Sequence, residues 1–518
     1  MNSGATALEF VDVTVPSSFT DLDDTPSSLT ADKWVKVNAG GTALELADEP
    51  SLSTIESNTT YYLSTTGHDD TGDGTSGSPW ATLAKAFEHL QSYRIQEGVT
   101  VTISVGNGTY TSVPAVTISH PDASRIEVIG EDMAASAFDI WDITFSPGNI
   151  EVQGDQTAKF PAGAVGYIMG KSSATNVSME HCQSFVVSSS SYSGGTGRTT
   201  ITPTADLESG GTSSGNGTLY TCPSSYNCVF EMAASAAITV TAGTVLGEFT
   251  GVCIQGNATT PGHGLVVEQG SELSASENLV IRDCDEGLRV AGRSGLYATT
   301  PVVHGNASHG FHLLDRSFAR FTDGLVSCQN GGSGLRVDGS TLMIGYSGSG
   351  EGMKHAVSDG NANKGLFCFA GGMATAGYLA GSHNGAGGIE VATGSTVNAP
   401  WSCLRMNAKG VVASGASRAL CAYSRVVGNA NDGVKCTEGS FVNVASGNCS
   451  YNTGDGILCQ DGASVKADTV TATNNDKGVV AEDGSFVNAG SGTVSSNTTD
   501  NFSPTANSVG NSNSYIKN

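Results

Sequence analysis

The sequence predicts a mostly β protein built around a parallel β-helix of about ten coils, each of ~23 residues. One glycine recurs along the second half of the chain, and eight of the nine gaps between its ten copies are 22, 23 or 24 residues long. A period in this range, kept over so long a stretch, is the signature of a solenoid. The same region is rich in Gly, Ser, Thr, Val and Asn rather than in helix formers, which favours short strands joined by tight turns. The ten glycines are Gly264, Gly287, Gly310, Gly334, Gly365, Gly388, Gly410, Gly433, Gly456 and Gly478.

Each coil is expected to contain three short strands and three turns. In residues 429–444 a strand follows Gly433, a Glu-Gly-Ser turn follows that strand, and a second strand alternates apolar and polar residues from Phe441. A third apolar stretch then leads to the next coil. We assign residues 210–501 to these coils and residues 502–518 to a polar tail without a periodic pattern.

A row of asparagines shares the register of the glycines, four residues ahead of each. Because coils stack about 4.8 Å apart, their amides are expected to form a structural ladder of hydrogen bonds along one corner. The alternative interpretation of such a row is contact with a glycan. The row consists of Asn306, Asn330, Asn361, Asn384, Asn429, Asn452 and Asn474, with Asn407 three residues ahead of its glycine.

Residues 1–50 contain a shorter repeat, since residues 2–10 and residues 38–46 follow one pattern ending in Thr-Ala-Leu-Glu. Between them lie Asp21-Leu-Asp-Asp-Thr-Pro-Ser27 and Lys33-Trp-Val-Lys-Val-Asn38. This segment resembles the repeats of bacteriophage tail fibres, in which a "DL-DTP-S" element precedes a "GK-V-VN-GT-LE" element. Asp32 stands where that family usually has Gly. The resemblance implies a virion-proximal segment that contacts other tail proteins.

Residues 51–138 are expected to start the β-helix and to supply a capping helix. Ser78 is a good N-cap and Pro79 a good first helical residue, and Leu83, Ala86, Phe87 and Leu90 would form one apolar face. The Tyr-Tyr-Leu-Ser-Thr-Thr-Gly segment at residues 61–67, with the Ser-Pro-Trp segment that follows, resembles the start of pectate-lyase-like β-helices of phage tail spikes and bacterial surface proteins. That resemblance implies a right-handed β-helix, whose open end the helix would plug.

Residues 139–209 interrupt the coil pattern. Residues 150–163 and 185–203 suggest short antiparallel strands joined by Gly-Gly turns. The segment resembles a small β-barrel module that is inserted in phage structural proteins. We therefore expect an inserted barrel between the start of the β-helix and its main coils.

Composition limits the classes of partner. The chain of 518 residues has a formal net charge of −25, which argues against binding nucleic acid or an anionic membrane surface. No apolar run is long enough for a membrane-spanning segment, and the start of the chain shows no secretory signal. The sequence contains no phosphate-loop, HExxH or paired-cysteine metal motif, so we expect neither a cofactor nor a metal.

Five acidic residues are the weak candidates for catalysis. Asp315 and Asp338 fall in adjacent coils, and two carboxylates about 5 Å apart would suit a retaining glycosidase. The competing interpretation is that Asp-Gly-Ser is ordinary turn chemistry, repeated in other coils. Asp283, Asp285 and Glu286 depart more from the repeat.

Aromatic residues and one insertion are the candidates for binding a receptor or glycan. Tyr378, Trp401 and Tyr423 each lie 13 residues after their glycine on consecutive coils. Alternation from Ala376 and Ala399 points them into the core, unless the chain bends there. The second candidate is the long gap before Gly365, which contains Tyr346, Lys354 and His355; projecting loops often carry function.

These features favour a virion protein: a tail fibre or tail spike subunit that recognises a host-surface glycan or other receptor. The resemblance implies a homotrimer in the virion tail, assembled in the host cytoplasm. The acidic composition favours neutral glycans or protein receptors. The alternative is a polysaccharide depolymerase, acting as a glycoside hydrolase or lyase, and the more favoured interpretation is that the chain is not an enzyme. A bacterial surface adhesin is the third possibility.

Overall fold

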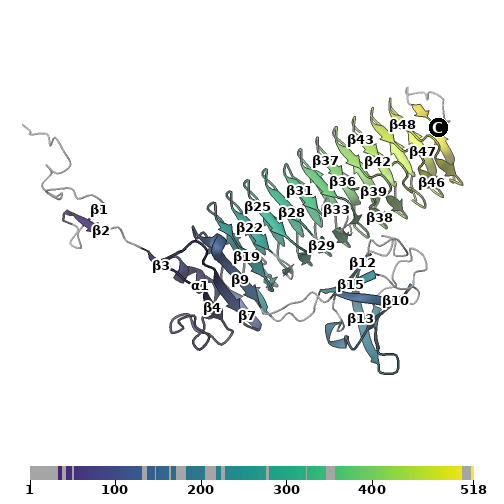
Figure 1. The fold of residues 1–518 in the computed structure, drawn as a ribbon. Coiled ribbons are helices and arrows are strands. Elements are labelled where there is room, and N and C mark those ends of the chain that lie inside the picture. Colours follow the sequence, from purple (N-terminus) through teal and green to yellow (C-terminus); the bar gives the residue numbers. More distant parts are fainter. Residues whose placement is uncertain are drawn as a thin grey trace, which may run out of the picture. The chain divides into compact units, whose positions relative to one another are not determined.

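The structure, a computed structural model, describes residues 33–37, 42–48, 52–130, 137–145, 148–160, 162, 165–170, 183–204, 217–222, 228–275, 279–322, 324–345, 356–504 and 515–517. Contacts divide the chain into two compact units, residues 1–54 with 92–94 and the remainder. In the first unit, β1 (Lys33–Val37) and β2 (Leu44–Asp48) form an antiparallel pair. The second unit contains a parallel β-solenoid and a barrel (Figure 1). In the described residues, no helix is both long and apolar enough to cross a membrane.

The start of the solenoid contains one α-helix, α1 (Leu83–Leu90), and a short 3-10 helix at Ala123–Arg125. Its apolar face is buried through Leu83, Ala86, Phe87 and Leu90. The helix starts later than Ser78 and Pro79 predicted, because the hydroxyl of Thr82 accepts from the N–H of Lys85 and caps it. β3 (Ser53–Ile55) pairs with β5 (Tyr93–Ile95). A separate four-stranded sheet consists of β4 (Thr59–Leu63), β6 (Val101–Val105), β9 (Ile126–Gly130) and β19 (Glu248–Thr250).

The barrel is inserted between two coils that still stack directly on each other. β7 pairs in parallel with β16 on the far side of the insertion, so residues 108–130 and 228–250 are successive coils. The described strands of the barrel lie between Ala137 and Cys222, and the strand at Gly217–Cys222 closes it. In order around the barrel, the strands are β10 (Ala137–Phe145), β11 (Gly148–Gln153), β14 (Arg198–Pro203), β13 (Gln183–Ser193), β12 (Val165–Gly170) and β15 (Gly217–Cys222).

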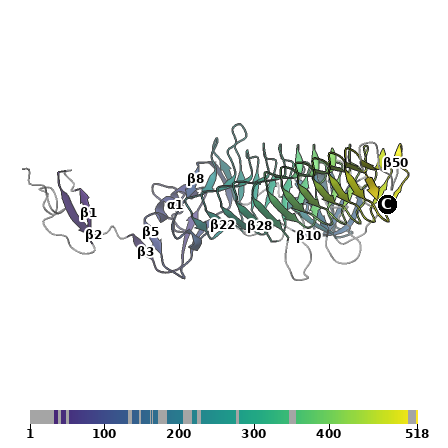
Figure 2. The same ribbon diagram turned by 90° about the horizontal axis from the view of Figure 1, so that it is seen from above.

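Three long parallel sheets form the solenoid, and Figure 2 shows their stacked coils from above. Sheet A, which follows the repeat glycines, has 13 strands. Ten of them follow the glycines found in the sequence, and β8, β17 and β50 add coils that lack the motif. The strands of sheet A are β8 (Val116–Ile118), β17 (Ile238–Val240), β21 (Leu265–Val267), β24 (Leu288–Val290), β27 (Phe311–Leu313), β30 (Leu335–Asp338), β33 (Lys364–Phe369), β36 (Gly387–Val391), β39 (Lys409–Ala413), β42 (Val434–Cys436), β44 (Ile457–Cys459), β47 (Lys477–Ala481) and β50 (Asp500–Ser503).

Sheet B has 12 strands and includes part of the predicted polar tail. β51 pairs with β48, Ile516 is fully buried and Tyr515 stacks on Phe486, so the chain returns to the solenoid there. The strands of sheet B are β18 (Val245–Leu246), β22 (Glu272–Ala275), β25 (Gly295–Ala298), β28 (Phe318–Phe321), β31 (Thr341–Ile344), β34 (Met373–Ala376), β37 (Thr396–Asn398), β40 (Arg418–Leu420), β43 (Phe441–Asn443), β45 (Ser464–Lys466), β48 (Phe486–Asn488) and β51 (Tyr515–Lys517).

Sheet C has ten strands, and the pair β46 (Thr471–Thr473) and β49 (Thr493–Ser495) follows them. Inward-facing Val, Ile, Leu, Phe and Cys side chains from all three sheets fill the core. The strands of sheet C are β7 (Gly108–Val113), β16 (Cys228–Met232), β20 (Cys253–Gln255), β23 (Val280–Arg282), β26 (Val302–His304), β29 (Leu325–Cys328), β32 (Ala356–Asp359), β35 (Leu379–Ala380), β38 (Cys403–Arg405) and β41 (Arg425–Val427).

The repeat glycines make room for the asparagine ladder between sheets C and A. A Cβ on Gly287 would lie 2.7 Å from Asn306 Nδ2 and 2.7 Å from the Gly310 carbonyl oxygen. Close packing therefore requires these glycines, whereas none of the ten has a positive φ. In the ladder, Asn330 Nδ2 donates to Asn361 Oδ1 at 2.9 Å, and equivalent bonds continue along the row. Its described members are Asn306, Asn330, Asn361, Asn384, Asn407, Asn429, Asn452, Asn475 and Asn497.

The assignment of Asn474 to this ladder is wrong, since Asn475 occupies the position. Asn474 is exposed and has a φ of 57°, at the left-handed corner that precedes every ladder residue. Asparagine suits both positions, because it tolerates the left-handed region. The coil is one residue short between the ladder and Gly478, as it is at Asn407 and Gly410.

Candidate functional site

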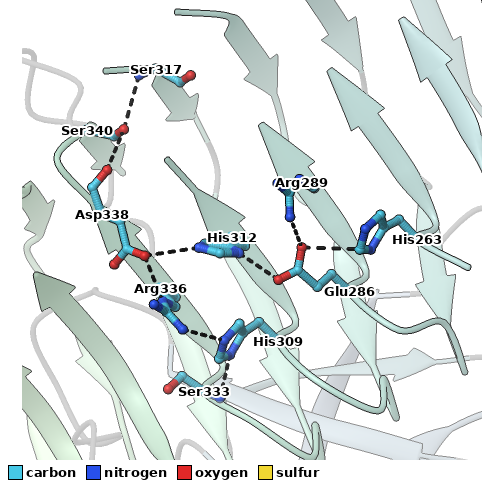
Figure 3. Close-up of polar contacts among 10 residues, drawn as sticks. All are labelled: His263, Glu286, Arg289, His309, His312, Ser317, Ser333, Arg336, Asp338 and Ser340. Carbon is cyan, nitrogen blue, oxygen red and sulfur yellow. Dashed lines mark hydrogen bonds and ion pairs between the residues drawn. The ribbon is translucent and has the colours of Figure 1, made fainter. Parts of the chain in front are cut away.

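An ionised cluster lies on the outward face of sheet A across three neighbouring coils (Figure 3). The strand register aligns Arg289 of β24 with His312 of β27 and with Arg336 of β30. Glu286 stands just ahead of β24, and Asp338 is the last residue of β30. The three strands therefore bring together two of the five acidic candidates, Glu286 and Asp338, around a histidine.

His312 lies between the two carboxylates. Its Nδ1 is 2.6 Å from Glu286 Oε1 and its Nε2 is 3.2 Å from Asp338 Oδ2. Each carboxylate also accepts from an arginine: Arg289 Nη1 lies 2.9 Å from Glu286 Oε2, and Arg336 Nε lies 2.9 Å from Asp338 Oδ2. The side chains of Glu286 and His312 are 8% and 9% exposed, so the two form a largely desolvated pair beneath the arginines.

The network keeps both carboxylates ionised. Burial alone would raise the pKa of Glu286, but hydrogen bonds and charge from His312 and Arg289 lower that pKa to about 2. Burial opposes the shift of Asp338 as well, yet His312 and Arg336 hold its pKa below the usual range. For His312, burial would lower the pKa, and the bonds to Asp338 and Glu286 raise it instead. This shift favours the imidazolium form, in which both ring nitrogens donate to carboxylates.

Two further histidines border the cluster. His309 Nδ1 accepts from the N–H of Ser333 at 3.0 Å. Burial, together with the positive charges of His312 and Arg336, lowers the pKa of His309 to about 4, so this ring is neutral. His263 lies one coil earlier, with Nδ1 at 3.7 Å from Asp285 and 3.8 Å from Glu286.

Both carboxyl groups of the cluster are deprotonated, which does not suit hydrolysis by a pair of carboxylates. Such hydrolysis needs one carboxyl that stays protonated as the general acid, whereas Glu286 and Asp338 are both held ionised. Among the described residues of the cluster, His312 has the raised pKa, and both its nitrogens are engaged by carboxylates. The geometry suits a fixed electrostatic network that positions Arg289 and Arg336 on the surface.

The other acidic candidates lie outside this network. The strand register aligns Leu313 with Val337, so Asp338 stands opposite Leu314. The predicted pairing of Asp315 with Asp338 therefore differs from the observed register by one residue. Asp315 is exposed at a left-handed corner with a φ of 59°. Asp283 also occupies a corner and lies 3.8 Å from Arg282 Nε. Asp285 reaches the border of the cluster through His263.

Sequence reasoning missed His312 and Arg336. Both stand two residues after a repeat glycine, as Arg289 does, on three consecutive coils. The coils on either side carry Val266 and Phe367 at this position. A run of ionisable residues at the same outward strand position of three consecutive coils was the available signal.

The aromatic row lies on the surface, so the prediction of an internal stack is wrong. Trp401 is 43% and Tyr423 is 56% exposed, while Tyr378 is partly exposed. Trp401 and Tyr423 have φ values of 54° and 62°, which turn the chain at the corner between sheets B and C. Ala399 remains fully buried two residues earlier, so the corner breaks the alternation after it.

The three aromatic rings form an offset parallel stack. Tyr378 and Trp401 have centroids 5.6 Å apart at 8°, and Trp401 and Tyr423 have centroids 5.3 Å apart at 10°. Parallel rings in contact are separated by about 3.5–4.0 Å, so centroids this far apart must be offset. Each ring therefore leaves part of its face open to solvent. The other binding candidates, Tyr346, Lys354 and His355, lie outside the described residues.

Among the described residues, no group of three or more His, Cys, Asp or Glu side chains is arranged to hold a metal ion. No protein-family model matches the sequence, and no curated protein matches it.

Structural comparison finds distant similarities. One is to a glycoside hydrolase, at 9% identity and a TM-score of 0.19, covering 89% of this chain and 96% of that one. A second is to the tailspike protein gp49 of Pseudomonas phage LKA1, at 11% and 0.22, covering 85% and 70%. A third is to the Gp54 tailspike of Acinetobacter baumannii bacteriophage AP22 in complex with a capsular saccharide, at 10% and 0.22, covering 81% and 73%. TM-scores this low do not establish a common fold, and the fold described above rests on the strand pairing of this chain.

Proposed function

We propose that this chain is a subunit of a phage tail fibre or tail spike that recognises a host-surface glycan through its β-solenoid. The sequence of residues 1–50 and of the Tyr-Tyr-Leu-Ser-Thr-Thr-Gly and Ser-Pro-Trp segments within residues 51–138 supports the phage assignment by resemblance. In this proposal residues 1–50 contact other tail proteins, and several copies of the chain, three by that resemblance, assemble in the host cytoplasm into the virion tail. The solenoid then projects its corners and outward faces toward the host.

The observation that carries glycan recognition is the exposed stack of Tyr378, Trp401 and Tyr423. Large aromatic rings are costly to expose to water, and here three of them occupy one corner of consecutive coils. The apolar face of a pyranose ring can lie against such a ring, with its hydroxyl groups still in water. The left-handed backbone of Trp401 and Tyr423 holds the rings outward, so little ordering remains to be done on binding.

The test is binding to a panel of purified bacterial capsular and lipopolysaccharide glycans, measured by isothermal titration calorimetry. For any glycan that binds, Trp401→Ala should weaken affinity at least ~10-fold, the loss of an aromatic hot spot. The matched control is Tyr451→Ala, because Tyr451 is 66% exposed at the corner between sheets C and A. Equal affinity of Trp401→Ala and the unchanged protein would reject the aromatic corner as the binding site.

The second candidate function is depolymerisation, for which the Glu286–His312–Asp338 network on the outward face of sheet A would be the site. The readout is reducing-end or unsaturated-sugar release from the same glycans, which separates a hydrolase from a lyase. If the network were catalytic, Glu286→Gln would abolish release while glycan affinity stayed within ~3-fold. Our expectation is no release by the unchanged protein, because neither carboxyl is held protonated.

A further inference from the structure

Two hydrogen-bond donors converge on one imidazole in the ionised cluster. His309 Nδ1 accepts from the N–H of Ser333 at 3.0 Å, and Arg336 Nη1 lies 3.0 Å from Nε2 of the same ring (Figure 3). A neutral imidazole has one nitrogen that accepts and one that donates. Ser333 is buried, so its N–H requires an acceptor within the protein. We therefore assign the accepting role to Nδ1, and His309 Nε2 carries the ring hydrogen.

In this tautomer the two donors face each other and lack an acceptor. His309 Nε2 and Arg336 Nη1 both carry hydrogen, so the 3.0 Å contact between them is not a hydrogen bond. Among the described residues, Nη1 of Arg336 has no other hydrogen-bond partner, because Asp338 takes the Nε edge of the guanidinium. An oxygen atom about 2.9 Å from both nitrogens would accept from each of them.

Charge favours an anionic oxygen at this point. Arg289, Arg336 and the imidazolium of His312 supply three positive charges, while Glu286 and Asp338 supply two negative ones, so the network has a net charge of +1 (3 − 2). The whole chain has a net charge of −25, which hides this local surplus. Hydrogen bonds from a guanidinium to an anion are also roughly twice as strong as bonds between neutral groups.

An aromatic surface adjoins the donors on the next coil of sheet A. The strand register aligns Arg336 with Phe367, and Phe369 is the last residue of the same strand. The two rings have centroids 5.6 Å apart, and Phe369 is 36% exposed. Lys364 Nζ covers one side of the Phe367 ring, 3.8 Å from its centroid, so Phe369 offers the open aromatic surface. Successive coils are about 4.8 Å apart, so one sugar residue can span this ring and the donors.

We propose that this face of sheet A binds an acidic sugar, whose carboxylate accepts from His309 Nε2 and Arg336 Nη1 while its pyranose ring lies against Phe369. The inference deepens the proposed function by naming an acidic residue of the glycan, and it rests on that function for the source of the sugar. The site is separate from the aromatic corner, which lies between sheets B and C. The ion pair of Arg336 with Asp338 orients the guanidinium before the ligand arrives.

The experiment measures binding of sodium glucuronate to the full chain by saturation-transfer NMR at constant ionic strength, with glucose and sodium acetate as reference probes. Glucuronate should bind saturably and at least ~10-fold more tightly than either reference, because it alone offers both a carboxylate and a pyranose ring. Glucose binding as tightly as glucuronate would overturn the carboxylate contact. Acetate binding as tightly would overturn the assignment to a sugar, and no saturable binding of glucuronate would overturn the whole inference.

Substitutions then locate the bound probe. Arg336→Gln should weaken glucuronate binding at least ~10-fold, and Phe369→Ala, which removes no member of the ionised cluster, at least ~3-fold. Arg320→Gln is the matched control, because it changes an exposed arginine of sheet B in the same way. Melting temperatures show that all the variants are folded. Glucuronate binding that neither Arg336→Gln nor Phe369→Ala weakens would reject this face as the site.

Trp401→Ala separates this inference from the proposed function. It should leave glucuronate binding unchanged, because Trp401 lies at the aromatic corner. Loss of glucuronate binding in Trp401→Ala would place the acidic sugar at that corner, which overturns the inference and leaves the proposed function standing. Conversely, a host glycan whose affinity Trp401→Ala leaves unchanged would reject the corner, while loss of glucuronate binding in Arg336→Gln would still support the acidic-sugar site.

Discussion

At the scale of single residues, His312 connects carboxylates from coils that are not neighbours. Glu286 belongs to the coil before it and Asp338 to the coil after it, so one imidazolium joins three coils. Removing it would leave two largely buried negative charges held only by Arg289 and Arg336. Charged groups that lose a partner in this way are costly, because desolvation is no longer compensated.

This contact predicts a pH-dependent stability. The raised pKa of His312 gives stability that is complete below its unfolded value of 6.5 and is lost as pH rises through the folded value. The lowered pKa of Glu286 gives stability that is present above 4.5 and is lost as pH falls toward about 2. His312→Gln should therefore cost roughly 1–3 kcal/mol near pH 5.5 and less near pH 9, measured as melting temperature by calorimetry.

His309→Gln is the control for this prediction. Burial lowers the pKa of His309 to about 4, so its native form is neutral. A base with a lowered pKa loses stability as pH falls from 6.5 toward 4, and the cost of His309→Gln should shrink over that range. If the cost of His312→Gln stayed constant from pH 5 to pH 9, its neighbours would not be holding a proton on it.

At the scale of strands and corners, the sequence predicted periodic features better than corners. The repeat glycines located ten strands of sheet A, because each glycine closely approaches a backbone carbonyl of the next coil, and all of them except Gly264 also approach an asparagine amide. The coils of β8 and β17 lack this glycine, so the repeat did not predict them. The strand at Tyr515–Lys517 was missed because only three residues return to the sheet.

Left-handed corners explain the errors in the candidate site. Non-glycine residues with positive φ recur at the corners, including Asp315, Asn474, Trp401 and Tyr423. Such a residue shifts the inward and outward alternation that follows it, so parity counted from Ala399 placed Trp401 in the core. Residue type does not predict these left-handed corners well, because Trp, Tyr, Glu and Ala occupy them here as well as Asn and Asp. The predicted pairing of Asp315 with Asp338 is likewise wrong by one residue of strand register.

At the scale of the molecule, the solenoid is a one-dimensional stack in which each coil contacts mainly the coils beside it. Stability in such a stack is approximately a sum of coil and neighbour terms. The asparagine ladder contributes to the neighbour terms, because each amide bridges two coils. Asn407 illustrates this: its Oδ1 accepts from the N–H of Asn384 at 2.8 Å, and its Nδ2 donates to the Gly381 carbonyl at 2.8 Å.

Replacing Asn407 with Leu should open the solenoid locally rather than everywhere. The change leaves the fully enclosed N–H of Asn384 and the carbonyl of Gly381 without these partners, a cost of roughly 2–3 kcal/mol. Amide hydrogen exchange followed by mass spectrometry should then accelerate ~30-fold or more in residues 379–430, and the change should fade toward the coils at residues 253–298. Asn474→Gly is the matched control, because glycine suits its left-handed corner and should leave exchange unchanged. Acceleration spread evenly over all the coils would show instead that the solenoid opens as one cooperative unit.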